Sequence, residues 1–376
     1  MVDRVKFKDT EVSRLGLGTM RLPVKTPLKR EANPMIDYKK GQELVDLAYQ
    51  NGVNYFDTAY IYHASKSEAF IGSALKKYPR DAYFLADKMP MWLVLRENDL
   101  ERIFNKQLKR CDVDYFDFYL LHSLDKGSWE KAKKYGAIDF VEKKRKEGKV
   151  KYFGFSFHGT LDVLEEIVAA HDWDFAQIQM NYLDWKNYKS KEQYEILEKA
   201  GIPTIIMEPV RGGKLADVPQ NVEELFKTAK PDKSVASWAM GYCASFDNVL
   251  TILSGMNANE QMLDNIETLS DFTPFNEQEM KICYNAAAML NKNDIIPCTG
   301  CDYCADCPKG VKISTIFATY NKVKNGEATA DEAAAEYATI DGKAGECINC
   351  GKCKTHCPQR INIPELMNGT VRDFFE

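Results

Sequence analysis

The chain has 376 residues, enough for one large domain and a small one, because single hydrophobic cores stop growing near roughly 250–300 residues. Its hydrophobic fraction of 45% and formal net charge of −5 are ordinary for a globular protein, and its basic runs lie beside acidic residues, so we expect no nucleic-acid partner. No stretch approaches the roughly 18 apolar residues of a membrane span and the N-terminus lacks the apolar core of a signal peptide, so we expect no membrane partner and a cytoplasmic location, where thiols stay reduced.

Short apolar runs rich in aromatic and β-branched residues alternate with longer charged segments of helical period between residues 14 and 271. The runs predict strands at 14–20, 55–59, 83–88, 115–122, 152–157, 175–181, 203–209 and 249–256. Each is followed by a predicted helix, such as 99–110, whose Leu100, Ile103 and Phe104 lie on one face. Such alternation indicates an α/β fold of the (β/α)8 TIM barrel type rather than a doubly wound sheet, and no G-x-G-x-x-G follows any strand. Residues 5–13 could form a hairpin that closes the barrel floor.

Polar residues stand at the carboxyl ends of three predicted strands, where the chemistry of such barrels gathers. Asp57 and then Tyr62 follow the second strand, Lys88 ends the third, and His122 ends the fourth. Any one of these residues could be a core residue whose polar atoms are hydrogen-bonded or ion-paired. Four such residues together are hard to explain by a purely structural role.

Three motifs carry a resemblance: Asp57-Thr58-Ala59-Tyr60-Ile61-Tyr62, Tyr119-Leu120-Leu121-His122, and Ser67-Glu68 followed by Gly72. With Lys88 at the end of the third strand, they resemble the aldo-keto reductase family over most of residues 5–271. The resemblance implies reduction of a small-molecule aldehyde or ketone with a nicotinamide cofactor. It implies that Tyr62 is the general acid, that Lys88 and Asp57 tune it, and that His122 orients the carbonyl. The chemistry is plausible because tyrosine has a reference pKa near 10 and needs a nearby cation to stabilise its phenolate.

The same resemblance implies a set of cofactor-binding residues: Met20, Ser156, Gln179, Met207, Pro209, Gly255, Gln261 and Asn265. Ser156 and Gln179 match positions that hold the carboxamide, and Met207 stands where many relatives stack a tyrosine on the ring. Residues 208–213 resemble the loop over the pyrophosphate. The basic motif that many relatives use for the 2′-phosphate is absent from residues 255–259, which leaves NADP(H) and NAD(H) as alternatives.

Four aromatic residues near the strand ends leave structural and functional interpretations open. His63 could relay a proton or cap its loop, and His158 could line the substrate pocket. Trp92 and Trp185 could each form a pocket wall or a structural plug.

Eight of the eleven cysteines fall into two runs near the C-terminus, each ended by a proline. The runs are Cys298, Cys301, Cys304, Cys307 and Cys347, Cys350, Cys353, Cys357. The second has the C-x2-C-x2-C-x3-C-P spacing of bacterial cubane clusters, in which the fourth thiolate binds the neighbouring cluster. Crossing the fourth ligands predicts one [4Fe-4S] cluster on Cys298, Cys301, Cys304 and Cys357, and another on Cys347, Cys350, Cys353 and Cys307. Zinc and disulfides are the alternatives, although zinc has no use for three evenly spaced cysteines plus Cys-Pro.

The sequence predicts three parts: a barrel at 1–275, a linker helix at 276–297 with its helix over 277–291, and a mainly α ferredoxin-like dicluster domain at 298–376. An Ala-rich helix is expected at 328–338, and the tail should depend on its clusters for folding. The tail is similar to the ferredoxin-fused branch of the family.

Three functions remain open at this stage. The first is a nicotinamide-dependent carbonyl reductase whose clusters exchange electrons with a redox protein partner or a second cofactor. The second is a ferredoxin-dependent reductase without nicotinamide, and the third is a redox-sensing interaction module. The intact set of Asp57, Tyr62, Lys88 and His122 argues against the third. The sequence carries no signal for flavin, although barrels accept flavin through phosphate sites.

Overall fold

The computed structural model describes residues 1–25, 35–291 and 295–376. Contacts between residues divide the chain into two units: Met1–Pro209 with Ala236–Glu277, and Val210–Val235 with Gln278–Glu376. The segment Val210–Val235, which the sequence assigned to the barrel, thus groups with the C-terminal residues. No helix in the described part of the chain is long and apolar enough to cross a membrane.

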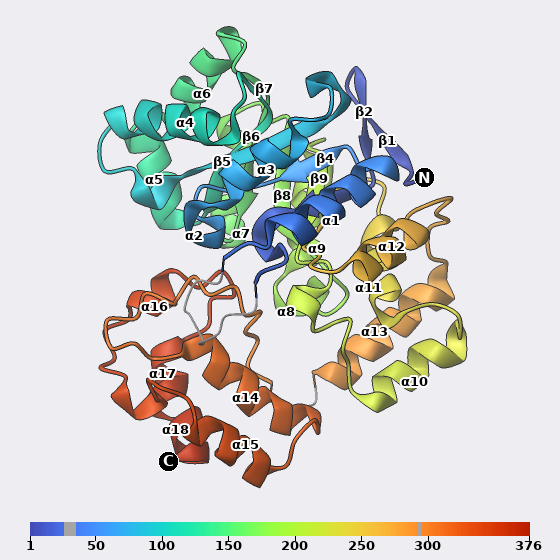
Figure 1. The fold of residues 1–376 in the computed structure, drawn as a ribbon, viewed down its shortest axis with the longest axis vertical. Helices are drawn as coiled ribbons and strands as arrows, with labels where there is room; N and C mark the ends of the chain where they lie inside the picture. Colours follow the sequence, from blue (N-terminus) through green and yellow to red (C-terminus); the bar gives the residue numbers. More distant parts are fainter. Residues whose placement is uncertain (26–34, 292–294) are drawn as a thin grey trace. The chain divides into compact units, whose positions relative to one another are not determined.

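The first unit contains eight parallel strands that close into a barrel (Figure 1) in the order β10-β3-β4-β5-β6-β7-β8-β9. The strands are β3 (Leu15–Gly18), β4 (Tyr55–Asp57), β5 (Phe84–Pro90), β6 (Phe116–Leu124), β7 (Val150–Phe157), β8 (Phe175–Gln179), β9 (Thr204–Met207) and β10 (Val249–Ser254). All eight predicted strands and the TIM barrel are therefore confirmed. Nearly every strand residue is buried, because parallel strands are covered on both faces.

Helices alternate with these strands along the chain. They are α1 (Tyr38–Gln50), α2 (Tyr62–Ser65), α3 (Ser67–Leu75), α4 (Asn98–Cys111), α5 (Lys126–Lys134), α6 (Ala137–Lys146), α7 (Leu161–Ala170), α8 (Asp184–Asn187), α9 (Ser190–Lys199), α11 (Val235–Ala244) and α12 (Asn259–Thr268). The helix predicted at 99–110 is confirmed as α4, whose Leu100, Ile103 and Phe104 are each only 1% exposed.

The barrel floor is closed by an antiparallel hairpin of β1 (Arg4–Phe7) and β2 (Thr10–Ser13), as predicted. Phe7 and Val12 of the hairpin belong to one buried cluster with inward-facing residues of the barrel strands, among them Tyr55, Phe118 and Phe175. The lower barrel is therefore a packed apolar plug. Any site inside the barrel must lie above it.

The second unit is mainly α-helical, as predicted. Its helices are α10 (Gln220–Ala229), α13 (Glu277–Leu290), α14 (Ile313–Asn325), α15 (Ala330–Ala338), α16 (Lys352–Thr355), α17 (Ile363–Asn368) and α18 (Thr370–Phe375). The helices predicted at 277–291 and 328–338 are confirmed as α13 and α15. Ile316, Phe317, Met367 and Val371 are fully buried in a core of the tail, and five of the clustered cysteines pack against that core.

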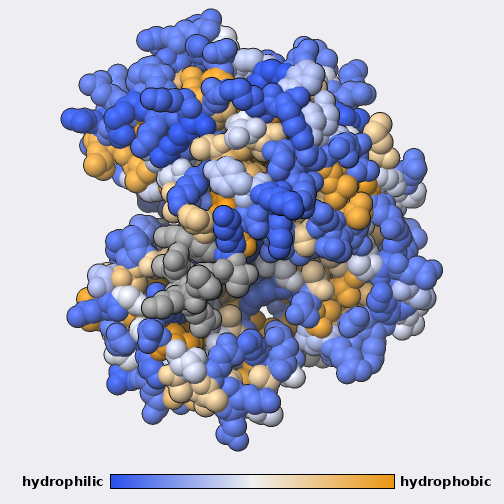
Figure 2. Space-filling model, in the orientation of Figure 1, coloured by the Kyte–Doolittle hydropathy of each residue, from blue (hydrophilic) through white to orange (hydrophobic). Residues whose placement is uncertain are grey.

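The surface visible in Figure 2 is largely hydrophilic, with apolar residues in separate groups. Among the described residues, the large hydrophobic side chains that are more than half exposed are Met1, Met35, Leu95 and Ile348. Single exposed apolar residues of this kind are normal and need no functional explanation.

Candidate functional site

A polar layer lies inside the barrel directly above its apolar floor. Successive side chains of a strand point to opposite faces, so residues two positions apart face the same way. Tyr55, Phe175 and Ile205 belong to the floor, which places Asp57, Gln177 and Met207 one level above them. Ala86 of the floor likewise sets Lys88 inward. This level of the barrel is therefore lined by polar side chains and one thioether.

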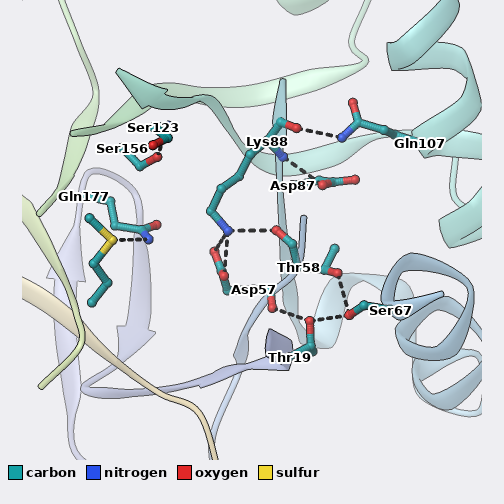
Figure 3. Close-up of polar contacts among 11 residues, drawn as sticks. Thr19, Asp57, Thr58, Ser67, Asp87, Lys88, Gln107, Ser123, Ser156 and Gln177 are labelled. Atoms are coloured by element: carbon teal, nitrogen blue, oxygen red, sulfur yellow. Dashed lines mark hydrogen bonds and ion pairs between the residues drawn. The ribbon is translucent and has the colours of Figure 1, made fainter. Parts of the chain in front are cut away.

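Lys88 and Asp57 form a buried ion pair at the centre of this layer (Figure 3). The Lys88 Nζ lies 2.6 Å from both carboxylate oxygens of Asp57 and donates to the carbonyl oxygen of Thr58 at 2.8 Å. The side chains are 0% and 4% exposed. Burial raises the pKa of Asp57, and the ammonium of Lys88 opposes that rise. Three acceptors therefore hold one cation where water is excluded.

Tyr62 and His122 border the same ion pair. The Lys88 Nζ lies 5.3 Å from the centre of the Tyr62 ring, and the rings of Tyr62 and His122 are 6.2 Å apart. Burial lowers the pKa of His122 well below its usual range, with Lys88 and His158 acting in the same direction. The imidazole is therefore neutral at neutral pH. Its Nδ1 is buried without a hydrogen-bond partner among the described residues.

The backbone after Tyr62 has positive φ at three successive residues, with 50° at His63, 52° at Ala64 and 65° at Ser65. Left-handed backbone costs roughly 1–2 kcal/mol per non-glycine residue, and such strain often marks functional sites. Burial lowers the pKa of His63, and hydrogen bonds to the backbone of Thr19 and Met20 oppose the shift. These bonds match the loop-capping interpretation of His63.

The two residues expected to hold a carboxamide lie differently. Ser156 faces inward, and its Oγ accepts from the backbone N–H of Ser123 at 2.7 Å. Gln179 is fully buried, and its amide donates to the Asp184 carboxylate at 2.8 Å. The register partner of Ser156 on β8 is instead Gln177, which sequence reasoning missed. Gln177 donates to the Met207 sulfur at 3.4 Å, and its Oε1 is buried with no donor in the described ranges.

The other expected cofactor residues lie at or near the ends of β3, β9 and β10. Met20 is in the 3-10 turn η1 (Thr19–Arg21), and Pro209 is buried just after β9. Gly255 packs on the Arg21 side chain, and a Cβ there would lie 3.3 Å from it. Gln261 accepts from the backbone of Asn257 at 2.9 Å, and buried Asn265 donates to Ser254 at 3.0 Å. Their cofactor roles remain predictions.

The aromatic residues whose roles the sequence left open have different surroundings in the structure. The Trp92 ring lies 4.9 Å from the ring of His122, beside the candidate site. Trp185 packs against Phe246, with their ring centres 4.8 Å apart, and Tyr194 and Tyr242 lie near it, a setting that favours the structural interpretation. His158 hydrogen-bonds to the Tyr188 hydroxyl at 3.1 Å.

Two hollows in the second unit are lined by the clustered cysteines. Cys298, Cys301, Cys304 and Cys357 line one of about 320 Å³, counting space open to solvent. Cys307, Cys347, Cys350 and Cys353 line the other, of about 410 Å³, and Cys304 borders it too. Each hollow thus draws on both cysteine runs, in the same crossed pairing that the spacing predicts. These donor sets fit two cubane clusters.

All eleven cysteines are free of disulfides. Across residues 1–25, 35–291 and 295–376, no three His, Cys, Asp or Glu side chains converge as they would around a single metal ion. The four thiolates of a cubane each bind a different iron atom. Ligands arranged around a hollow are what such a cluster requires.

Comparison with known proteins identifies the two parts of the chain. A model of the aldo/keto reductase family matches residues 14–288. The chain belongs to that family. A model of the 4Fe-4S dicluster domain matches residues 297–361 of this reductase, which is therefore an oxidoreductase enzyme with an iron–sulfur domain.

Relatives of the reductase are distant. It is 28% identical to "Probable aldo-keto reductase 1" of Glycine max over 225 residues. The match covers 56% of this chain and 61% of the soybean protein, which is less than two thirds of that protein's length. It is 21% identical over 310 residues to "NADH-specific methylglyoxal reductase" of Escherichia coli (strain K12), covering 70% of this chain and 91% of that one. A solved structure, aldo-keto reductase AKR11C1 from Bacillus halodurans (holo form), is similar with a TM-score of 0.63 at 22% identity, covering 76% and 96% of the two chains. At that identity the likeness supports the barrel fold alone.

Proposed function

We propose that this reductase uses NADH or NADPH to reduce an aldehyde or ketone inside its barrel, with Tyr62 as the general acid. We further propose that its tail holds two [4Fe-4S] clusters that exchange electrons with a redox partner or a second cofactor. The barrel proposal rests on one observation above all: the buried Lys88–Asp57 pair, joined at 2.6 Å, lies 5.3 Å from the Tyr62 ring. A buried cation beside a tyrosine stabilises the phenolate that remains after proton donation.

The upper barrel offers groups that suit a nicotinamide. The buried Oε1 of Gln177 has no donor in the described part of the chain, and a carboxamide N–H would satisfy it. The Met207 thioether beside it is able to pack on a ring face. A bound nicotinamide would supply the hydride that reduces the carbonyl carbon, because no protein side chain stores a hydride. The name of the Escherichia coli relative makes NADH the first cofactor to test.

The protein's own groups divide the remaining work. Tyr62 donates its phenolic proton to the carbonyl oxygen as negative charge develops there. Neutral His122 donates a hydrogen bond to the same oxygen and orients it, a form of electrostatic stabilisation aimed at the transition state. Asp57 keeps Lys88 charged and in place, and Trp92 forms a wall of the substrate pocket beside His122.

Replacement of Tyr62 by Phe tests the barrel proposal, with Tyr60→Phe as the matched control. Tyr60 lies in the same motif, but its ring packs on Arg110, with the guanidinium carbon 4.5 Å from the ring centre. We expect Y62F to lose about 10²–10⁴-fold in kcat for methylglyoxal and other small aldehydes, while NADH binding measured by fluorescence titration stays intact. Y60F should keep its activity. Full turnover by Y62F would mean that another group is the acid.

Anaerobic titration with NADH and then NADPH tests whether the clusters exchange electrons with the nicotinamide rather than with a separate redox partner. Cluster absorption in the visible region and nicotinamide absorption are followed together. Bleaching of the clusters would support electron exchange between the two cofactors and prompt a search for the one-electron mediator that hydride chemistry requires. Clusters that stay oxidised while aldehyde is reduced would refute exchange with the nicotinamide.

A further inference from the structure

The backbone of Lys88 lies at an open edge of the barrel wall. β4 ends at Asp57, in register with Ala86, whereas β5 continues to Pro90. The carbonyl of Ala86 accepts from Thr58, so this edge of β5 faces β4. Lys88 is two positions further on and faces the same way. Its backbone N–H and C=O therefore have no strand partner on that side.

Two side chains take the place of the missing strand (Figure 3). The Lys88 N–H donates to the Asp87 Oδ1 at 2.8 Å, and the Gln107 Nε2 on α4 donates to the Lys88 carbonyl oxygen at 2.9 Å. Gln107 is itself fixed, because its Oε1 accepts from the Tyr119 hydroxyl at 2.5 Å. Asp87, Gln107 and Tyr119 are all fully buried. The conformation of Lys88 is thus held from outside the barrel wall.

Asp87 in turn faces a second buried carboxyl group, that of Glu68 on α3. Glu68 is 0% exposed, and its Oε2 accepts from the Arg110 guanidinium at 2.6 Å. Its Oε1 is buried and receives no hydrogen bond within the described ranges. Two carboxyl groups in contact cannot both be ionised in a dry interior, and a bond between their oxygens requires a proton.

The close approach of α3 and α4 creates this pairing. A Cβ on Gly72 would lie 2.0 Å from the carbonyl oxygen of Cys111 on α4, so only glycine fits there. Glu68 precedes Gly72 by four residues and lies on the same helix face. The glycine therefore lets Glu68 reach between the strand and α4.

We propose that Asp87 and Glu68 share one proton, carried by Asp87, and that this neutral Asp87 is a positioning residue for Lys88. The hydroxyl of Asp87 donates to the Glu68 Oε1, while its other oxygen accepts from the Lys88 N–H. The pair has a net charge of −1, which Arg110 balances. Asp57 then remains the sole carboxylate that binds the Lys88 ammonium in the described part of the chain. This inference rests on the proposed role of Lys88.

The surroundings of the pair support a single proton. The titratable groups that face it are Arg110 and Cys111 on α4, Lys88 on β5 and Tyr119 on β6. Burial raises the pKa of Asp87 well above its usual range and the Glu68 carboxylate adds to the rise, while Lys88 opposes it. Burial also raises the pKa of the Cys111 thiol, so that group stays neutral. Of the two acids, Glu68 is the one that forms an ion pair with Arg110. The guanidinium stabilises the Glu68 carboxylate, and the proton is therefore assigned to Asp87.

Kinetics of three variants test the positioning role. Asp87→Asn keeps an acceptor for Lys88 and a donor for Glu68, so it should retain kcat within about threefold, whereas D87A should lose about 10–100-fold in kcat with little change in the Kd for NADH. Glu68→Gln should let Asp87 ionise. The negative charge then moves closer to Lys88, and the alkaline limb of the kcat profile should shift to higher pH. D87N as impaired as D87A, or E68Q with an unchanged pH profile, would overturn the proposal.

Infrared spectroscopy tests the shared proton independently of activity. The wild type at neutral pH should show the carbonyl stretch of a protonated carboxylic acid, and D87N should lose it. Asp117→Asn is the matched control, because buried Asp117 is paired with Arg80 and Lys151 and should contribute no such band. A band unchanged in D87N would refute the shared proton. If Y62F stays active, the proposed function fails while the infrared result still decides whether Asp87 is protonated.

Discussion

The buried Lys88–Asp57 pair predicts a large and strongly non-additive effect on stability. Removing one partner of a buried ion pair typically costs about 3–5 kcal/mol, because the other charge is left without compensation. Lys88 and Asp57 are 0% and 4% exposed, so Asp57→Asn and Lys88→Met should each reach that range. The double variant removes both charges. It should lose only about 1–3 kcal/mol, mainly because the Thr58 carbonyl loses its donor.

The assay is anaerobic urea denaturation followed by tryptophan fluorescence. All five tryptophans lie between residues 92 and 238, so the signal reports on the first unit rather than on the iron–sulfur tail. The free energies of unfolding of the wild type, both single variants and the double variant complete a thermodynamic cycle. A double variant that loses as much as the two single variants combined would refute the argument, since two independent residues would behave in that way.

The pH dependence of K88M gives a second check on the same reasoning. Without Lys88, burial alone acts on Asp57, and it raises the pKa of that carboxyl group. The folded variant then binds a proton that the unfolded chain releases above its reference pKa of about 3.9. K88M should therefore gain stability as the pH falls from 7 towards 5, by at most about 1.4 kcal/mol per pH unit relative to the double variant. An equal pH response in the two variants would contradict this.

Three further predictions concern other parts of the molecule. Gly72→Ala should lower the free energy of unfolding in urea by about 3 kcal/mol or more, because the new Cβ would lie 2.0 Å from the backbone oxygen of Cys111. Gly127→Ala is the control and should be neutral or stabilising, because the nearest atom to its Cβ would be 3.7 Å away. Because burial lowers the pKa of His122, the wild type should lose stability as the pH falls below about 6.5, and His122→Gln should lose less over the same range in matched urea titrations. Cys357→Ser should lower iron content and remove the same electron paramagnetic resonance signal as Cys298→Ser, and retention of about eight iron atoms would contradict the two-cubane assignment.

The strands and the cysteine hollows could be predicted because their signals are local. Each barrel strand is a short apolar run between helical segments, and the cysteine spacing by itself indicated the crossed pairing that the two hollows show. The grouping of Asp57, Tyr62, Lys88 and His122 followed from the rule that the ends of barrel strands meet.

The remaining features of the site depend on contacts between residues that are far apart in the sequence. Gln177 and Gln179 point to the same face of β8, so the alternation of side chains could not distinguish them. In the structure, Gln179 donates to the Asp184 carboxylate on α8, whereas Gln177 donates to the Met207 sulfur. The pairing of Glu68 with Asp87 joins a helix to a strand, with no spacing rule between them. A search for buried acids flanking a strand-end lysine is the one signal that could have drawn attention to Asp87.

The crossed cysteine hollows also constrain how the protein is made. The hollow that begins with Cys298 is completed by Cys357, the last cysteine of the second run. During synthesis, the first three ligands leave the ribosome well before the fourth, and the other hollow waits for its three ligands from the second run. Insertion of the proposed cubanes would therefore follow translation of the second cysteine run, after the barrel strands have already emerged. A nascent chain stalled between Cys353 and Cys357 would carry all four cysteines of one hollow but only three of the other.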